Sequence, residues 1–168
     1  MSSIFSIGYQ GYQMNEFVNV LHKYDISILV DVRSVPYSKI HCWNKENLKQ
    51  ALKSEGIYYV NFGSRFGARP DNPNLYRNGR ADFELMSKAD QFLIGCEQIL
   101  KSKGTLCLMC MEEQPSMCHR TILCVRALYE RGMDVSHIIN KGKRTVDQED
   151  VEMALVKFYF GVNADVDG

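Results

Sequence analysis

Short apolar runs alternate along this chain with longer stretches in which apolar residues recur every three or four positions. The short runs predict strands at Ile4–Gly8, Ile26–Val32, Ile57–Phe62, Thr105–Cys110 and Val135–Ile139. Between the first two strands, Phe17, Val20, Leu21 and Tyr24 have the spacing of one helix face. Strands that alternate with helices are typical of βαβ units and a parallel sheet. We therefore predict a three-layer α/β/α sandwich with about five mainly parallel strands.

Capping and breaking residues locate the other helices. Asn44 is a candidate N-cap for a helix over about Lys45–Ser54, which Gly56 ends. Asp82 predicts one long helix that ends at Gly104, and its inward positions would be Phe83, Met86, Phe92, Cys96, Ile99 and Leu100. A C-terminal helix is expected over about residues 147–160.

The segment Gly63–Arg80 holds three glycines, two prolines and four arginines. This composition indicates a long loop, and a loop of that length inside a compact domain is usually functional or mobile. Arg65 and Arg69 flank Phe66 in this loop, which suits the binding of a phosphate or the stacking of a base. A solvated loop without a ligand is the competing interpretation.

The length of the chain fits one domain over residues 1–168, and its charge balance predicts no broad charged surface. Lysine plus arginine number 20 and aspartate plus glutamate number 20, so the formal net charge is zero. A neutral chain lacks the positive field of proteins that coat nucleic acid or an anionic membrane, so neither partner is favoured. No run approaches the roughly 18 apolar residues of a membrane span, and the amino terminus does not resemble a signal peptide. We therefore expect a cytoplasmic protein with six reduced cysteines.

The segment Cys110–Arg120 carries the strongest chemical signal. It lies between a predicted strand and a helix that begins at Pro115 or Ser116, at the carboxyl end of the sheet, where open α/β folds bind ligands. This start would place Cys118, His119 and Arg120 in the first helical turn, where an anion or a thiolate is stabilised. We expect a catalytic group of Cys118, His119, Arg120 and Glu112. The competing interpretation is local packing of these side chains.

Two other segments are candidates for the same site. Asp31 and Arg33 lie two residues apart on a strand and so share a face. They either form a structural ion pair or join the site, with Asp31 orienting His119 and Arg33 holding an anion. At the end of the first strand, Gly8 and Gly11 permit close backbone approach and Tyr9 offers a hydroxyl, but neither common phosphate-loop pattern is present.

A metal site is the less favoured interpretation of the cysteines. Cys107 and Cys110 are three residues apart on a predicted strand, so they should point to opposite faces. A zinc site from Cys110, Cys118, His119 and His41 would match no common ligand spacing. We therefore expect no metal and no cofactor.

Taken together, these motifs resemble the family known as domain of unknown function 488. The matching residues are Ser6–Gly11, Val30–Arg33 with Pro36 and Ser38, Phe66–Arg69, Leu108–Glu112, Pro115, Cys118–Arg120 and His137–Ile138. The resemblance covers about residues 3–140, in a form with Gly8-Tyr9-Gln10 where many members have Gly-His-Ser. It implies a compact α/β fold with the Asp-Val-Arg and Cys-His-Arg segments near each other. It supplies no reaction.

We expect an enzyme, a hydrolase or transferase, that acts on a phosphate-bearing small molecule, nucleotide or nucleic-acid end. His119 would transfer protons, Glu112 or Asp31 would orient it, and Cys118 would be a nucleophile or line the pocket. Substrate-binding groups would come from Arg33, Gly8, Tyr9, Gly11, Ser38, Arg65, Arg69 and Cys110. The alternative is a binding module that senses a nucleotide or anion without turnover, and a protein–protein adaptor comes third.

Overall fold

One mixed sheet of six strands forms the centre of the computed structural model, which describes residues 4–160. Its strand order is β3-β2-β6-β1-β7-β8. The strands are β1 (Ile4–Gly8), β2 (Ile28–Asp31), β3 (Tyr58–Asn61), β6 (Leu106–Cys110), β7 (Val135–Ile139) and β8 (Arg144–Asp147). All neighbouring pairs are parallel except β7 with β8. The predicted, mainly parallel sheet is confirmed, and β8 is an additional edge strand.

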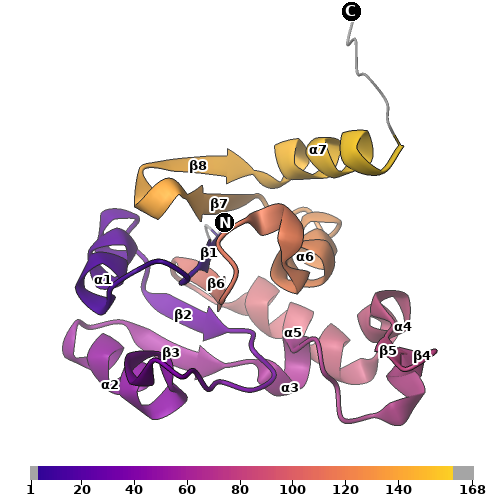
Figure 1. Ribbon diagram of the computed structural model, residues 1–168, viewed down its shortest axis with the longest axis horizontal. Helices are drawn as coiled ribbons and strands as arrows, with labels where there is room; N and C mark the ends of the chain where they lie inside the picture. Colours follow the sequence, from indigo (N-terminus) through magenta and orange to yellow (C-terminus); the bar gives the residue numbers. More distant parts are fainter. Residues whose placement is uncertain (1–3, 161–168) are drawn as a thin grey trace, which may run out of the picture.

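Helices pack on both faces of this sheet (Figure 1). One face is covered by α1 (Met14–Lys23), η1 (His41–Trp43) and α2 (Lys45–Ser54). The other is covered by α3 (Gly63–Phe66), α5 (Asp90–Lys101), the π-helix η4 (Arg120–Val125) and α6 (Arg126–Tyr129). The α/β sandwich is therefore confirmed. The C-terminal helix α7 (Gln148–Phe160) follows β8.

Strand β6 shows how the two cores are separated. Leu106, Leu108 and Cys110 belong to the core beneath α5 and α6. Cys107 and Met109 belong to the core beneath α1 and α2. Alternate residues of a strand point to opposite faces, and here both faces are covered, so the whole strand is apolar. The prediction that Cys107 and Cys110 face opposite ways is confirmed.

The predicted long helix after Asp82 is wrong. The chain forms two helices, α4 (Phe83–Lys88) and α5, because Ala89 between them is extended, with a ψ of 142°. The predicted start is right, since the Asp82 carboxylate accepts a hydrogen bond from the Leu85 N–H at 3.0 Å. Leu100 is 39% exposed and does not face the core as predicted. No glycine or proline marks the break in the sequence.

The segment Gly63–Arg80 is not a simple loop. It contains α3, η2 (Pro73–Leu75) and β4 (Tyr76–Arg77), which pairs with β5 (Arg80–Ala81) in a small hairpin. Asn78 and Gly79 both have positive φ angles, 52° and 74°. Asn-Gly is the usual sequence of such a two-residue hairpin turn, so this element was detectable from the sequence.

Among the helices within residues 4–160, none combines the length and apolar character needed to cross a membrane.

Candidate functional site

The site is built where β1 and β6 end side by side. Gly8 is the register partner of Cys110, and beyond the strands the Tyr9 N–H donates to the Cys110 carbonyl at 3.0 Å. The loop after β6 then passes directly over Gly8. A Cβ atom on Gly8 would lie 1.7 Å from the Glu112 carbonyl oxygen, so only glycine allows this passage. Gly8 thus shapes the site through its backbone.

Glu112 joins two cysteines in one cluster. Its Oε2 lies 3.2 Å from Cys110 Sγ and 3.3 Å from Cys118 Sγ. The two sulfur atoms are in direct contact, whereas the Cα atoms of the two cysteines are 7.8 Å apart. Disulfides usually span Cα separations of about 4.4–6.8 Å. Both cysteines are buried and Glu112 is half-buried.

Cys118 does not lie in the first turn of the helix as predicted. Pro115–Met117 form a separate 3-10 turn, η3, and Cys118 itself is extended, with φ −123° and ψ 139°. Its carbonyl accepts hydrogen bonds from the N–H groups of Thr121 and Ile122. Cys118 therefore lies between η3 and the helix that follows, and its side chain lies against Glu112.

Arg120 is fully buried behind this cluster and holds the loop after β6. Its Nη1 donates to Cys110 Sγ at 2.9 Å and to the Glu112 carbonyl at 2.5 Å. Its Nη2 donates to the Glu113 carbonyl at 3.3 Å. Within residues 4–160, Arg120 forms no ion pair with a carboxylate. Burial lowers its pKa to about 10, and nearby Cys107 and Glu112 oppose this shift. The side chain thus remains a cation at neutral pH.

A chain of buried side chains fixes the orientation of Arg120. Its Nε donates to the Ser6 hydroxyl at 3.1 Å, and Ser6 in turn contacts His137 Nδ1. His137 Nε2 lies 2.6 Å from Gln148 Oε1, while the Gln148 amide nitrogen donates to Glu152. Because Gln148 Oε1 can only accept, His137 carries its hydrogen on Nε2, and its Nδ1 accepts the Ser6 hydroxyl hydrogen. Every donor in the chain therefore has a defined acceptor.

His137 remains neutral in this position. Burial lowers its pKa to about 4, and the hydrogen bond with Gln148 opposes this shift. An imidazolium could not accept the Ser6 hydrogen bond, so protonation of His137 would break the series of hydrogen bonds that supports Arg120.

His119 lies next to Cys118 and turns its ring toward the second strand. Its Nε2 is 3.3 Å from the Val32 carbonyl, and its Nδ1 is 4.0 Å from Cys118 Sγ. Burial lowers the pKa of His119, while main-chain contacts with Val32 and Phe66 and the charge of Glu112 act in the opposite direction. A carbonyl only accepts, so Nε2 carries the hydrogen and Nδ1 offers a lone pair toward Cys118. His119 can therefore accept a proton at Nδ1.

Asp31 and Arg33 belong to the opposite face of the sheet. Asp31 is the register partner of Met109, whose side chain lies in the core beneath α1 and α2. Arg33 donates to Asp31 through Nε at 2.9 Å and Nη2 at 2.7 Å, and the Tyr59 hydroxyl donates to Asp31 at 2.6 Å. Among the described residues, none of the hydrogen bonds of Asp31 reaches His119. The predicted structural ion pair is what forms, so the side chains of Asp31 and Arg33 do not join the Cys-His-Arg cluster. The two segments nevertheless lie near each other as expected, because His119 contacts the Val32 carbonyl between Asp31 and Arg33.

The Tyr9 side chain, Gly11 and Ser38 have their contacts elsewhere, although the Tyr9 N–H bonds the Cys110 carbonyl. The Tyr9 ring stacks on Trp43 at 4.5 Å and is buried. Gly11 has a φ of 86° and supports the turn into α1. The Ser38 N–H donates to the Asn44 side chain at 2.6 Å. This contact explains why Asn44, although it precedes α2 as predicted, makes no side-chain cap.

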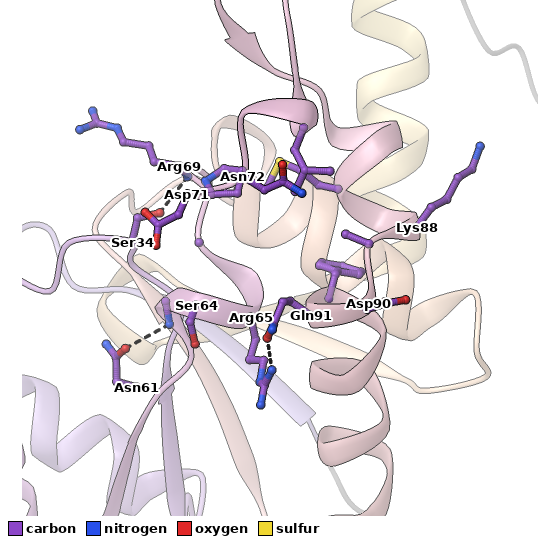
Figure 2. A pocket seen from close by; sticks show the side chains of 17 residues that line it. Ser34, Asn61, Ser64, Arg65, Arg69, Asp71, Asn72, Lys88, Asp90 and Gln91 are labelled. Atoms are coloured by element: carbon purple, nitrogen blue, oxygen red, sulfur yellow. Dashed lines mark hydrogen bonds between the residues drawn. The ribbon is translucent and has the colours of Figure 1, made fainter.

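Arg65 and Arg69 line an open pocket of about 1140 Å³ (Figure 2). Arg65 contacts Gln91, whereas Arg69 and Lys88 extend from opposite sides of the rim. The remaining polar lining consists of Ser34, Asn61, Ser64, Asp71, Asn72 and Asp90. Arg33 and Arg120 are buried on internal partners elsewhere, so the four arginines do not form one anion site.

The pocket and the cysteine cluster lie close together through His119. His119 contacts the main chain at Val32 and Phe66, and Ser34, Arg65 and Gly67 on either side of those residues line the pocket. His41, considered as a zinc ligand with Cys110, belongs to η1 on the face of α1 and α2.

Ser6, His137 and Gln148 were not assigned to the site from the sequence. The available signal was a polar residue inside a largely apolar strand, Ser6 in β1 and His137 in β7, where Ser136 is also polar. A buried polar group needs a hydrogen-bond partner, so two such residues on neighbouring strands indicate each other. Ser6 and His137 are indeed register partners.

Comparisons with known proteins give one result. No curated protein and no solved structure matches the chain. A family model matches residues 13–127, which include Asp31, Arg33, the Arg65–Arg69 segment and the whole cluster from Cys110 to Arg120. The match spans more than half of the chain, and the chain therefore belongs to the family described as domain of unknown function DUF488.

Proposed function

We propose that this protein is an enzyme that acts on a phosphate-bearing small molecule or nucleotide, with His119 as the group that transfers a proton. The ligand would lie in the pocket lined by Arg65 and Arg69. The observation that carries the proposal is the position of His119. It contacts the main chain at Val32 and Phe66, which lie within two residues of Ser34, Arg65 and Gly67 in the pocket lining, and its proton-accepting Nδ1 faces the cluster of Cys118 and Glu112.

The pocket suits a phosphate group because its cationic side chains outnumber its carboxylates. Arg65, Arg69 and Lys88 contribute three positive charges, against two negative charges from Asp71 and Asp90. Arginine binds phosphate through two parallel N–H groups, and the amide and hydroxyl side chains of the lining add neutral donors.

A cysteine nucleophile receives less support. Cys118 is 1% exposed, and its sulfur lies against Cys110 and Glu112. A substrate atom could reach it only after this contact opens. In the proposed enzyme, Cys118 therefore contributes to the local electrostatics of the site, and a water molecule or substrate hydroxyl is the group that His119 deprotonates.

Substitutions test the proposal by separating binding from turnover. Nucleoside mono-, di- and triphosphates and p-nitrophenyl phosphate serve as probes, with calorimetry for binding and phosphate or nitrophenol release for turnover. His119→Gln should lower kcat by about 10²-fold or more without changing Kd, since general acid–base catalysis contributes about that much. Arg69→Ala should raise Kd. The matched controls are His41→Gln and Arg144→Ala, which change exposed residues outside the pocket.

The burial of both cysteines favours a second candidate, a module that senses a nucleotide without turnover. Such a protein should bind a probe, lose binding in Arg69→Ala and release no product in any variant. If neither binding nor turnover responds to Arg69→Ala or His119→Gln, both candidates are contradicted.

A further inference from the structure

We propose that Cys110, Glu112 and Cys118 bind a zinc ion, which contradicts our sequence-based expectation that the protein binds no metal. Their two sulfur atoms and one carboxylate oxygen all lie within 4.8 Å of one another. The inference is independent of the proposed phosphate chemistry, because it rests on these three side chains and on the groups behind them.

The donor set is one that zinc prefers. Two cysteine sulfurs with a carboxylate oxygen suit a borderline-soft ion, whereas magnesium and calcium bind oxygen alone. Ligands of a tetrahedral zinc at its usual bond lengths lie about 3.6 Å apart. Glu112 Oε2 is 3.2 Å from one sulfur and 3.3 Å from the other, so these two separations need to widen by only a few tenths of an ångström. The two sulfur atoms, 2.50 Å apart, would have to separate by about 1.1 Å to admit the ion.

Backbone spacing favours a metal over a disulfide. The Cα atoms of Cys110 and Cys118 are 7.8 Å apart, beyond the range of about 4.4–6.8 Å that a disulfide spans. A metal ion bound between the two sulfur atoms allows a longer separation of the Cα atoms than a direct S–S bond does. The carboxylate of Glu112 lies against both sulfur atoms and would be the third ligand of the ion.

The charges around the cluster are compatible with a divalent ion bound to two thiolates. Arg120 is buried against the cluster, and its partners are the Ser6 hydroxyl, the carbonyls of Glu112 and Glu113 and the sulfur of Cys110. A buried cation without a counter-charge is costly, and the nearby Glu112 carboxylate supplies one, since its charge opposes the fall in the pKa of Arg120. Two thiolates and one carboxylate carry three negative charges. Arg120 balances one of them, and a divalent ion balances the other two.

The surroundings resemble the outer shell of a metal site. Protein groups that hydrogen-bond to metal ligands fix their orientation. Arg120 donates to the sulfur of Cys110 and to the carbonyl of Glu112, and Ser6, His137 and Gln148 hold Arg120 in turn. Three protein ligands leave one position of a tetrahedral ion open for water or substrate, as in catalytic zinc sites.

Cobalt and zinc titrations of the full-length protein test this site. The chelator-treated, reduced protein should bind one Co²⁺ per chain and develop the thiolate-to-cobalt charge-transfer bands and intense visible bands of a tetrahedral site. Competition with a chromophoric chelator then measures the zinc affinity. Cys118→Ser should abolish the cobalt bands, and Glu112→Gln should weaken zinc binding by at least about tenfold, the loss typical even for an outer-shell partner.

Matched controls keep the test specific. Cys42→Ser changes a free, half-buried cysteine, and Glu113→Gln changes the neighbouring carboxylate outside the cluster. Both should bind zinc as the wild type does, and circular dichroism should show that Glu112→Gln is folded. The proposal is overturned if the wild type binds no cobalt, if Cys118→Ser keeps the tetrahedral bands, or if mass spectrometry of the freshly purified protein shows Cys110 and Cys118 joined by a disulfide.

Discussion

Replacement of Gly8 by alanine should cost far more stability than the loss of one glycine. The added Cβ would lie 1.7 Å from the Glu112 carbonyl oxygen and 2.8 Å from Glu113 Cα, and both are backbone atoms. An ordinary contact needs about 3.4 Å or more, so the loop must retreat by about 1.7 Å. This shift would break the hydrogen bonds from Arg120 to the Glu112 carbonyl and from Tyr9 to the Cys110 carbonyl. At about 1 kcal/mol each, with the strain of overpacking, Gly8→Ala should lower the free energy of unfolding by about 3 kcal/mol or more.

Urea denaturation measures this loss, and Gly11→Ala is the control. Gly11 has a positive φ of 86°, but a Cβ there would meet nothing within 4 Å. Its substitution should cost only about 1 kcal/mol, the penalty of a left-handed backbone. If Gly8→Ala proved no more destabilising than Gly11→Ala, the loop after β6 would not press on Gly8, and the geometry of the whole cluster would be wrong.

Three other predictions concern the buried polar groups. Because the pKa of His137 is about 4 in the folded protein and about 6.5 when unfolded, the unfolded chain binds the proton first as pH falls, and stability should drop by about 2 kcal/mol between pH 7 and pH 5. His137→Asn should flatten most of that dependence in urea titrations at the two pH values. Tyr59→Phe removes a 2.6 Å hydrogen bond to Asp31 and should cost about 1.5 kcal/mol by thermal denaturation, whereas Tyr58→Phe, at an exposed ring, should cost less than about 0.5 kcal/mol. Asp31→Asn leaves Arg33 buried without its counter-charge and should destabilise by about 3 kcal/mol or more, and a smaller loss would mean that this pair is not the structural contact described here.

The elements that the sequence predicts well are those whose ends are marked by a local signal in the sequence. The observed β1 and β7 coincide with the predicted strands, and α2 coincides with the predicted helix Lys45–Ser54. In each case a glycine, a capping residue or a change of periodicity defines the boundary. The break at Ala89 has no such signal, because neither a glycine nor a proline stands there and alanine favours helix.

The composition of the site was only partly predictable, because it depends on which face of the sheet each strand presents. Glu112, Cys118, His119 and Arg120 share one segment, so their proximity follows from the sequence. Asp31 was expected beside them, but strand pairing aligns it with Met109 and directs it to the opposite face. With the pairing of β2 and β6 known, alternation alone would have excluded Asp31 from the cluster of Cys110. The burial of Arg120 depends on Ser6, more than a hundred residues away in the chain, and no local pattern reveals it.

The most direct test of the account is the alkylation rate of each cysteine in the folded, reduced protein, measured peptide by peptide by mass spectrometry. Burial raises the pKa of the Cys96, Cys107 and Cys124 thiols, so these three should react only on unfolding. In the presence of a chelator, Cys110 and Cys118 should react before them, and added Zn²⁺ should protect these two while the labelling of Cys42 stays unchanged. If Cys110 and Cys118 instead react only on unfolding, with or without Zn²⁺, they are ordinary core residues and the cluster around Glu112 and Arg120 is not the functional centre.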